Sequence, residues 1–304
     1  MLAVLLSAAL IGSHAQTFDA WPTWSPNGKL IAFVRTVGTR SDLEVVRADG
    51  THLRRLSSKA AKWASSWSPN SRRLVFARVQ HGGRDNTIWR VGVNGTALRK
   101  IATGYDPMWS PDGSTIAYGH LGRIETVKPD GSSRRDLTKG AGPLAWSPDG
   151  TRIAFSTWSQ GLPRLHVLAL RTRISDELAN GYWPTWSPDG TKIGFSNGCF
   201  AVVIAADASS SAPACIAAPV GSQPPRWSPD SASYVYCFDR GLRGRVLTPG
   251  PSTSLMPVTP GCEPDWSPDG TTIAFDRPGE GTDGSRIYLM NPDGTNVRPL
   301  LRGS

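Results

Sequence analysis

Trp266-Ser267-Pro268-Asp269-Gly270-Thr271-Thr272-Ile273-Ala274-Phe275 is the last of seven copies of one ten-residue motif in this chain. The copies begin at Trp24, Trp67, Trp109, Trp146, Trp186, Trp227 and Trp266. Their starts are 43, 42, 37, 40, 41 and 39 residues apart. A β-rich unit that recurs about every 40 residues is typical of a β-propeller, because one four-stranded blade cannot bury both of its faces alone. The sequence therefore predicts an all-β, seven-bladed β-propeller of four-stranded antiparallel blades.

Each motif copy has the chemistry of a strand, a tight turn and a second strand. Ser147-Pro148-Asp149-Gly150 suits a type I turn, because Pro sets φ at the second position and the Asp side chain bonds to nearby backbone. An aromatic residue follows nine positions after each Trp. These aromatics are Phe33, Phe76, Tyr118, Phe155, Phe195, Tyr236 and Phe275. We expect the Trp and the aromatic to form a repeated core between blades.

Asp-Gly and Asn-Gly pairs predict a second, outer hairpin in several repeats. Both residues tolerate positive φ, which two-residue hairpin turns require. The pairs are Asp49-Gly50, Asn94-Gly95, Asp130-Gly131 and Asp293-Gly294. Repeats four to six have Arg171-Thr172-Arg173, Ala208-Ser209-Ser210 and Pro249-Gly250-Pro251 instead. We therefore expect irregular outer hairpins in these three repeats.

The Trp-Ser-Pro-Asp-Gly repeats resemble those of TolB, the periplasmic protein of the Tol-Pal system, and of TolB-like proteins. The resemblance covers about residues 20 to 301 and implies a WD-like β-propeller. TolB itself carries an α/β domain ahead of a six-bladed propeller, whereas seven motif copies are present here. The resemblance thus implies the fold and leaves membership of a Tol-Pal system open.

The N-terminus has the pattern of an export signal. Met1 to Gly12 is an apolar stretch too short to span a bilayer, and Ser13-His14-Ala15 places small residues where signal peptidase reads them. We expect a signal peptide over residues 1–15, cleavage before Gln16, and one propeller domain over 16–304. A first propeller strand in this segment is the alternative. The prediction is a secreted or periplasmic protein with no transmembrane segment after cleavage.

Four cysteines agree with export, and their places in the repeat favour one pairing. Cys199 opens the third strand of repeat five and Cys215 ends its fourth, so the two face each other across a hairpin. Cys237 ends the second strand of repeat six and Cys262 begins the first strand of repeat seven. We expect the disulfides Cys199–Cys215 and Cys237–Cys262, with buried free thiols as the alternative.

The sequence gives little support for an enzyme. Oligogalacturonate lyases are propeller relatives whose metal is held largely by histidines, but the four histidines after the leader are scattered through the repeats: His52, His81, His120 and His166. A metal site needs three or four convergent ligands. The Gly-x-Ser-x-Gly nucleophile elbow is absent, and the motif aspartates are explained by their turns. We expect no enzymatic activity, no metal and no cofactor.

A formal net charge of +9 indicates anionic partners. No nucleic-acid-binding motif is present, so we expect a protein or an anionic cell-envelope polymer, no nucleic acid, and a monomer. A basic rim is a second feature of the charge pattern. It is predicted on the fourth strands from Arg54, Arg55, Arg99, Lys100, Arg134, Arg135 and Arg298. Charges on an exposed edge also simply prevent strand-to-strand aggregation.

Strand direction predicts a binding surface at one end of the propeller channel. Residues three and four before each motif Trp, and eleven and twelve after it, gather at that end. The candidates are Trp21, Arg35, Trp63, Arg78, Tyr105, His120, Trp158, Tyr182, Trp183 and Arg277. Aromatic and Arg side chains dominate binding hot spots and also suit sugar stacking. Simple packing of the aromatics between blades is the alternative. The leading interpretation is a non-enzymatic binding scaffold, and the alternative is an oligogalacturonate-lyase-like or sugar-binding propeller.

Overall fold

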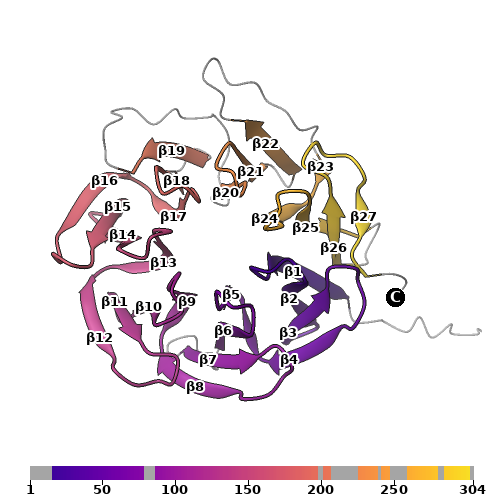
Figure 1. Ribbon diagram of the computed structural model, residues 1–304, viewed down its shortest axis with the longest axis horizontal. Helices are drawn as coiled ribbons and strands as arrows, with labels where there is room; N and C mark the ends of the chain where they lie inside the picture. The colour runs from indigo at the N-terminus through magenta and orange to yellow at the C-terminus, as the bar shows by residue number, and fades with distance from the viewer. Residues whose placement is uncertain are drawn as a thin grey trace, which may run out of the picture.

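The sheets of the protein stand side by side in a ring around a central axis (Figure 1). The computed structural model describes residues 16–78, 86–197, 201–206, 225–238, 241–246, 259–279 and 284–301. Within these ranges every regular element is a β-strand and no helix occurs. Accordingly, no helix in the described ranges can cross a membrane. The all-β, antiparallel propeller fold is confirmed, while the predicted leader 1–15 lies outside the described residues.

The strands follow the motif copies in chain order. The first three groups are β1 (Thr17–Trp24), β2 (Leu30–Val37), β3 (Arg40–Arg47), β4 (Arg54–Ser58); β5 (Ala60–Trp67), β6 (Arg73–Arg78), β7 (Thr87–Gly92), β8 (Arg99–Thr103); β9 (Tyr105–Trp109), β10 (Ile116–His120), β11 (Arg123–Val127) and β12 (Arg135–Lys139). The next two are β13 (Ala141–Trp146), β14 (Arg152–Ser159), β15 (Leu162–Ala169), β16 (Ser175–Asn180); β17 (Tyr182–Trp186), β18 (Lys192–Ser196) and β19 (Ala201–Ala205). The last two are β20 (Arg226–Trp227), β21 (Ser233–Phe238), β22 (Gly241–Val246), β23 (Thr259–Pro260); β24 (Cys262–Trp266), β25 (Ile273–Pro278), β26 (Ser285–Met290) and β27 (Arg298–Pro299).

Within each group, consecutive strands pair antiparallel, from the first strand at the axis to the last at the rim. Hydrogen bonds divide the described strands into six sheets. Five contain one group each, four strands in four of them and three in β17–β19. The sixth has eight strands, because the first and last groups are joined.

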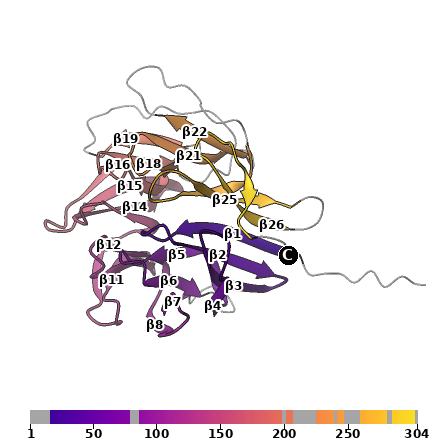
Figure 2. The ribbon, with the colours of Figure 1, turned by 45° about the vertical axis from the view of Figure 1, so that its right-hand side comes forward.

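Because the first complete repeat begins near Trp21, the sequence predicts that no blade is shared between the chain termini. The termini instead share this eight-stranded sheet, which corrects that prediction. Phe18 forms a parallel bridge with Ser285 at the start of β26, on the edge that β27 also occupies (Figures 1 and 2). Arg286 Nη1 donates to the Thr17 carbonyl over 2.9 Å, and Ser285 Oγ donates to the Asp19 carbonyl over 2.9 Å. β1 begins at Thr17, earlier than the expected start near Trp21, and this extra length reaches the neighbouring group.

The motif turn forms as predicted. Gly150 N donates to the Ser147 carbonyl over 2.9 Å, with Gly150 at φ 70°. The Ser147 hydroxyl donates to Asp149 Oδ1 at 2.5 Å and accepts from Arg152 N at 2.9 Å. The same Ser contacts recur in the other copies, at Ser25, Ser68, Ser110, Ser187, Ser228 and Ser267. The turn therefore follows from residues that are local in sequence.

The repeated aromatics form the predicted core. The aromatic at the ninth position is almost completely buried in every group, from Phe33 at 0% exposure to Tyr236 at 6%. Several motif Trp indoles also donate to a backbone carbonyl of the preceding group, for example Trp186 Nε1 to the Ala145 oxygen over 3.2 Å. Five of the seven motif Trp residues thus add an indole hydrogen bond to the apolar packing between neighbouring groups.

Irregular outer hairpins were expected in groups four to six. In the fourth group, β15 and β16 pair from Leu168↔Ser175 to Arg164↔Asn180. Their turn closes over four residues, with a hydrogen bond from Arg173 N to the Ala169 carbonyl, whereas the Asp-Gly turn of the first group closes over three, from Gly50 N to the Arg47 carbonyl. Arg173 adopts φ 60° where no Gly is present, so this turn departs from the regular ones as expected. The outer hairpins of groups five and six lie at residues outside the described ranges.

The disulfide Cys237–Cys262 is present and joins β21 to β24, with Cα atoms 5.1 Å apart. This confirms one of the two predicted bridges and links two neighbouring sheets covalently. Cys199 and Cys215 lie outside the described residues.

Candidate functional site

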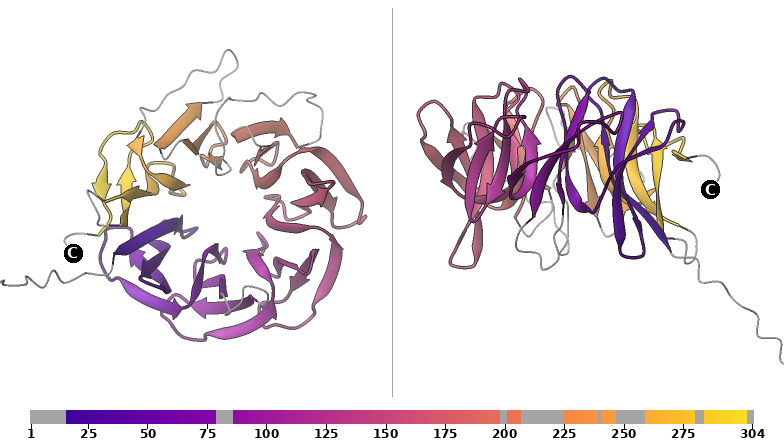
Figure 3. Two further views of the ribbon diagram at one scale, coloured as in Figure 1. Left: turned by 180° about the vertical axis from the view of Figure 1, so that it is seen from behind. Right: turned by 90° about the horizontal axis from the view of Figure 1, so that it is seen from below.

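The ring has two faces, seen edge-on in Figure 3. The turn face carries the motif turns, for example residues 147–150. The hairpin face carries the β2–β3, β10–β11 and β14–β15 connections together with the starts of the first strands. The ten predicted residues all belong to strand ends or connections on the hairpin face.

A bulge in the innermost strand shapes the hairpin face. Strand register slips between Ala20 and Thr23, and equivalent slips occur in β13, β17 and β24. The residue three before the motif Trp adopts a left-handed φ of 49° to 57° in four groups: Trp21, Asp106, Trp183 and Glu263. Such φ values are unusual for residues other than Gly, Asn and Asp, and packing must hold the two Trp residues and Glu263 there.

Three predicted residues come together as an aromatic cluster, which we define as Trp158, Tyr182 and Trp183. The Trp158 and Tyr182 ring centroids are 6.3 Å apart, and those of Tyr182 and Trp183 are 5.0 Å apart in an edge-to-face contact. Trp158 is 63% exposed, while Tyr182 and Trp183 are half-buried. The cluster joins the end of β14 to the start of β17, so it spans two neighbouring sheets.

Two exposed leucines on the same face were missed by the sequence reasoning. Leu162, at the start of β15, is 53% exposed, and its neighbour Pro163 pairs with Trp158. Leu121 is 79% exposed in the connection between β10 and β11, at φ 48°. The signal in the sequence was a large apolar residue beside Gly122 or Gly161 in a hairpin turn, where polar residues are usual.

Arg35 and Arg78 contact residues of their own or the neighbouring group, and they do not converge on one site in the channel. Both Asp19 oxygens accept from Arg35, at 2.7 and 2.8 Å, and Glu44 Oε2 lies 3.0 Å from Arg35 Nη1. The hydrogen bonds that Arg35 donates to Asp19 raise the pKa of Arg35. Arg78 donates twice to Ser57 Oγ, at 3.1 and 2.7 Å, and its guanidinium lies 4.1 Å from the Trp89 ring centroid.

His120 and Arg277 are likewise engaged by their own sheets. His120 Nδ1 lies 3.1 Å from Glu125 Oε1 and 2.8 Å from Arg134 Nη2. Burial alone would raise the pKa of Glu125, but hydrogen bonds from Arg134, Tyr118 and His120 lower it to about 2. The Arg277 guanidinium lies 5.3 Å from the Tyr288 ring centroid. These residues stabilise the outer strands of their sheets.

The remaining candidates are inter-strand packing residues. Tyr105 is half-buried, and its ring covers Gly119, where a Cβ would collide with it. Trp21 packs on the core shared by the first two groups, and its indole donates to the Glu263 carboxylate of the last group. The backbone of Trp63 lies in β5, and its side chain lies outside the described residues.

The last group contributes a set of half-buried carboxyls beside the disulfide. Burial raises the pKa of Glu263 to about 7, and the Asp276 charge adds to this. Burial also raises the pKa of Asp276 to about 6, although its Oδ1 accepts from Cys262 N over 3.0 Å. Asp265 is part of the same strand, and its Oδ2 accepts from Trp24 N of the first group over 2.7 Å. Glu263 and Asp265 of the last group therefore both contact the first group.

No metal site is formed in the part of the chain that the structure describes, where no three His, Cys, Asp or Glu side chains converge. His81 lies outside that part. The features that remain on the hairpin face are an exposed aromatic cluster, two exposed leucines, and carboxyls with pKa values near neutrality.

Sequence comparison finds relatives named TolB. The chain is 33% identical over 153 residues to a "Protein TolB homolog" of Chlorobium luteolum, a match covering 48% of this chain and 35% of that protein. It is 35% identical over 98 residues to a "Tol-Pal system protein TolB" of Gluconobacter oxydans, covering 30% and 22%. The matches thus span about a third or less of these relatives' length. No family model matches the chain.

Solved structures share the fold at low sequence identity. A Kuenenia stuttgartiensis hydrazine synthase chain has a TM-score of 0.69 at 13% identity, covering 97% of this chain and all of that one. An oligogalacturonate lyase in complex with manganese has a TM-score of 0.65 at 13% identity, covering 95% and 86%. TolB from Acinetobacter baumannii has a TM-score of 0.53 at 16% identity, covering 93% and 63%. At these identities the similarity concerns the propeller fold alone.

Proposed function

Because the chain is a TolB-like β-propeller, we propose that it is a non-enzymatic binding scaffold that engages a protein or an anionic cell-envelope polymer through its hairpin face. The proposal includes a leader over residues 1–15, a secreted or periplasmic location, and a ring of seven blades, one for each motif copy. It requires no cofactor.

The observation that carries the proposal is the aromatic cluster of Trp158, Tyr182 and Trp183. A soluble protein gains nothing by leaving a Trp 63% exposed to water, and Leu121 and Leu162 extend the apolar surface on neighbouring connections. Trp and Tyr are the commonest anchors of binding interfaces, because they bury much area for little loss of side-chain freedom. The paired strand ends beneath the cluster hold the rings in place before binding.

Charged side chains lie beside the aromatic cluster and give it a polar rim. Arg164 lies next to Leu162 in β15 and bonds Glu177 Oε1 at 3.0 Å and Asn180 Oδ1 at 2.6 Å. Arg123 pairs with Asp136 on the neighbouring sheet. An apolar centre surrounded by such partly exposed pairs is the usual anatomy of a protein interface.

A sugar-binding propeller is the second candidate. Aromatic rings also stack on sugar faces, and an oligogalacturonate lyase has the same fold. A lyase would in addition need a metal site, so elemental analysis of the purified protein and a galacturonan depolymerisation assay test this candidate directly.

The test of the binding proposal is Trp158→Ala in the full chain. The partner is first captured from a cell-envelope fraction and identified, and its affinity for the wild type and the variant is then measured with purified components. We expect the variant to bind at least about 1 kcal/mol more weakly, close to a five-fold loss, with an unchanged melting temperature.

Ile174→Ala is the matched control, since Ile174 is 59% exposed on the turn face. The control is expected to bind like the wild type. Equal binding by Trp158→Ala and the wild type would show that the hairpin face is not the binding surface.

A further inference from the structure

Arg90 occupies a strand position that holds an uncharged residue in every other repeat. It lies in β7 opposite Val75, and the positions equivalent to Arg90 in the other groups hold Val45, Thr126, Val167, Val203, Gly244 and Leu289. A guanidinium at this position is costly, because the neighbouring surface is the core between two sheets. The repeat itself gives no structural reason for the charge.

Strand register gathers Arg90 with two more arginines on one face of its sheet. Arg99 in β8 lies directly opposite Arg90, and Arg73 in β6 lies two residues from Val75, on the diagonal. Residues two apart in a strand share a face. Val75, Ile88 and Ile101 on this face pack into the core with Trp109 of the third group, so all three arginines face the third group.

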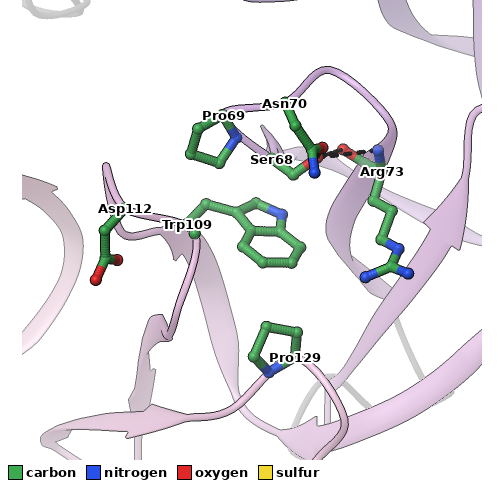
Figure 4. Close-up of a pocket in the computed structure, with 8 residues that line it drawn as sticks. Ser68, Pro69, Asn70, Arg73, Trp109, Asp112 and Pro129 are labelled. Atoms are coloured by element: carbon green, nitrogen blue, oxygen red, sulfur yellow. Dashed lines mark hydrogen bonds between the residues drawn. The ribbon is translucent and has the colours of Figure 1, made fainter.

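A pocket of about 160 Å³ opens beside these arginines on the turn face. Arg73 lines it together with Asn70 of the second motif copy and Trp109 and Pro129 of the third group (Figure 4). Arg90 and Arg99 face the same junction by strand register, and burial with the charges of Arg73 and Arg99 lowers the pKa of Arg90. We call this junction, with the pocket that Arg73 lines and the two other arginines beside it, the groove between the second and third sheets.

Two buried donors in this groove have no partner. Arg90 Nε is fully buried and makes no hydrogen bond. Trp109 is 6% exposed, and its Nε1 is also unpaired, with the indole nitrogen on the side of the ring towards Asn70 and Arg73 in Figure 4. In five other motif copies the indole donates to the preceding group: Trp67, Trp146, Trp186, Trp227 and Trp266. A buried donor without a partner costs stability, which a bound acceptor would restore.

The carboxylates at the groove are engaged in their own turns. Asp112, which lines the pocket, accepts from Ser110 Oγ at 2.5 Å and Ser114 N at 3.0 Å. Asp130 accepts from the Ser132 backbone N at 2.9 Å and hydroxyl at 2.7 Å. On the opposite wall the second motif copy has Asn70 where five copies have Asp, which removes one negative charge. Three guanidiniums thus face two carboxylates that are already hydrogen-bonded in their turns. N–H donors in the groove therefore remain available to an anion.

We propose that the groove between the second and third sheets, built by Arg73, Arg90 and Arg99 with the Trp109 indole, binds a phosphate group. A phosphate offers several acceptor oxygens and a charge near −2, which matches three guanidiniums and an additional N–H donor. The phosphate is supplied by a phosphorylated sugar, a phospholipid headgroup or the free ion. This site lies on the turn face, away from the surface proposed above, and is independent of it.

The test is titration calorimetry of the full-length mature protein with inorganic phosphate in a chloride buffer of constant ionic strength. Arg90→Val installs the residue that three other groups carry at this position, Val45, Val167 and Val203. We expect the wild type to bind phosphate and the variant to bind at least ten-fold more weakly, with an equal or higher melting temperature because the unpaired buried Nε is gone.

Arg135→Ala is the matched control, because Arg135 is the exposed counterpart of Arg99 in the third group. Unchanged affinity in this control supports a built site. Absence of phosphate binding by the wild type, wild-type affinity in Arg90→Val, or an equal loss in Arg135→Ala would each overturn the proposal.

Two further ligands identify the source of the phosphate. Competition by glucose 1-phosphate indicates a sugar phosphate, and Arg90-dependent sedimentation with phosphatidylglycerol vesicles indicates a lipid headgroup. Binding of inorganic phosphate alone indicates the free ion.

Discussion

Glu263 makes the contact between the last and first groups of strands sensitive to pH. Its carboxylate accepts from the Trp21 indole across the junction of the two chain ends, and burial with the nearby Asp276 charge raises its pKa from 4.5 to about 7. The folded protein therefore holds a proton between these two pH values that the unfolded chain has released. Raising the pH through this window lowers the stability of the folded state.

Glu263→Gln removes this dependence and keeps an oxygen for the Trp21 indole. Each pH unit between 4.5 and 7 corresponds to about 1.4 kcal/mol, so the Glu263 contribution amounts to about 3 kcal/mol. We expect the variant to gain about 3 kcal/mol over the wild type between pH 4.5 and 7, and the difference to stay constant above pH 7.

Urea unfolding followed by Trp fluorescence across this pH range measures the difference, with the disulfides kept intact. Asp269→Asn is the control. Hydrogen bonds from Ser267 and Thr271 lower the pKa of the exposed Asp269 from its ordinary value of 3.8, so its contribution to stability is lost only as the pH falls below that value. The difference for this control is therefore expected to be flat between pH 4.5 and 7. Asn occupies this position in two other copies, Asn27 and Asn70. A difference for Glu263→Gln that is as flat across this range as that of Asp269→Asn would refute the reasoning.

Two other perturbations have expected outcomes. Replacing Cys237 and Cys262 with Ser opens a link over a sequence separation of 25 and should lower the free energy of unfolding by about 3 kcal/mol, measured as a lower urea midpoint; an unchanged midpoint would contradict a stabilising bridge. Glu125→Gln should be less stable than the wild type near neutral pH, and the deficit should shrink as the pH falls from 4.5 toward 2, because the lowered pKa of Glu125 stabilises only its ionised form. Urea midpoints at acidic and neutral pH test this, and a deficit that grows in acid would count against it.

Sequence alone predicted the repeated parts of the fold because their causes are local. The turn around Asp149 is built from hydrogen bonds among residues within five positions, and Phe155 is buried because the strand period places it there. The fourth outer hairpin shows the limit of such signals. Its turn has no Gly, yet Arg173 adopts the left-handed conformation, since pairing along β15 and β16 compensates for the strain.

The candidate site was likewise only partly predictable from the sequence. Strand direction correctly brought Trp158 and Tyr182 to one face, but it did not determine where the charged candidates point. Arg35 turns to Asp19 and Glu44, and Arg78 turns to Ser57, because each guanidinium finds partners that lie on other strands.

Local patterns in the chain were sufficient to predict the repeat, the turn chemistry, the buried aromatics and one disulfide. Tertiary structure alone decided which side chains became partners: the junction of Glu263 with Trp21, the pairing of β1 with β26, and the exposed position of Leu121. Strand periodicity and turn propensity depend on residues a few positions apart, so they can be read from the sequence. Burial and charge pairing depend on contacts between strands far apart in the chain.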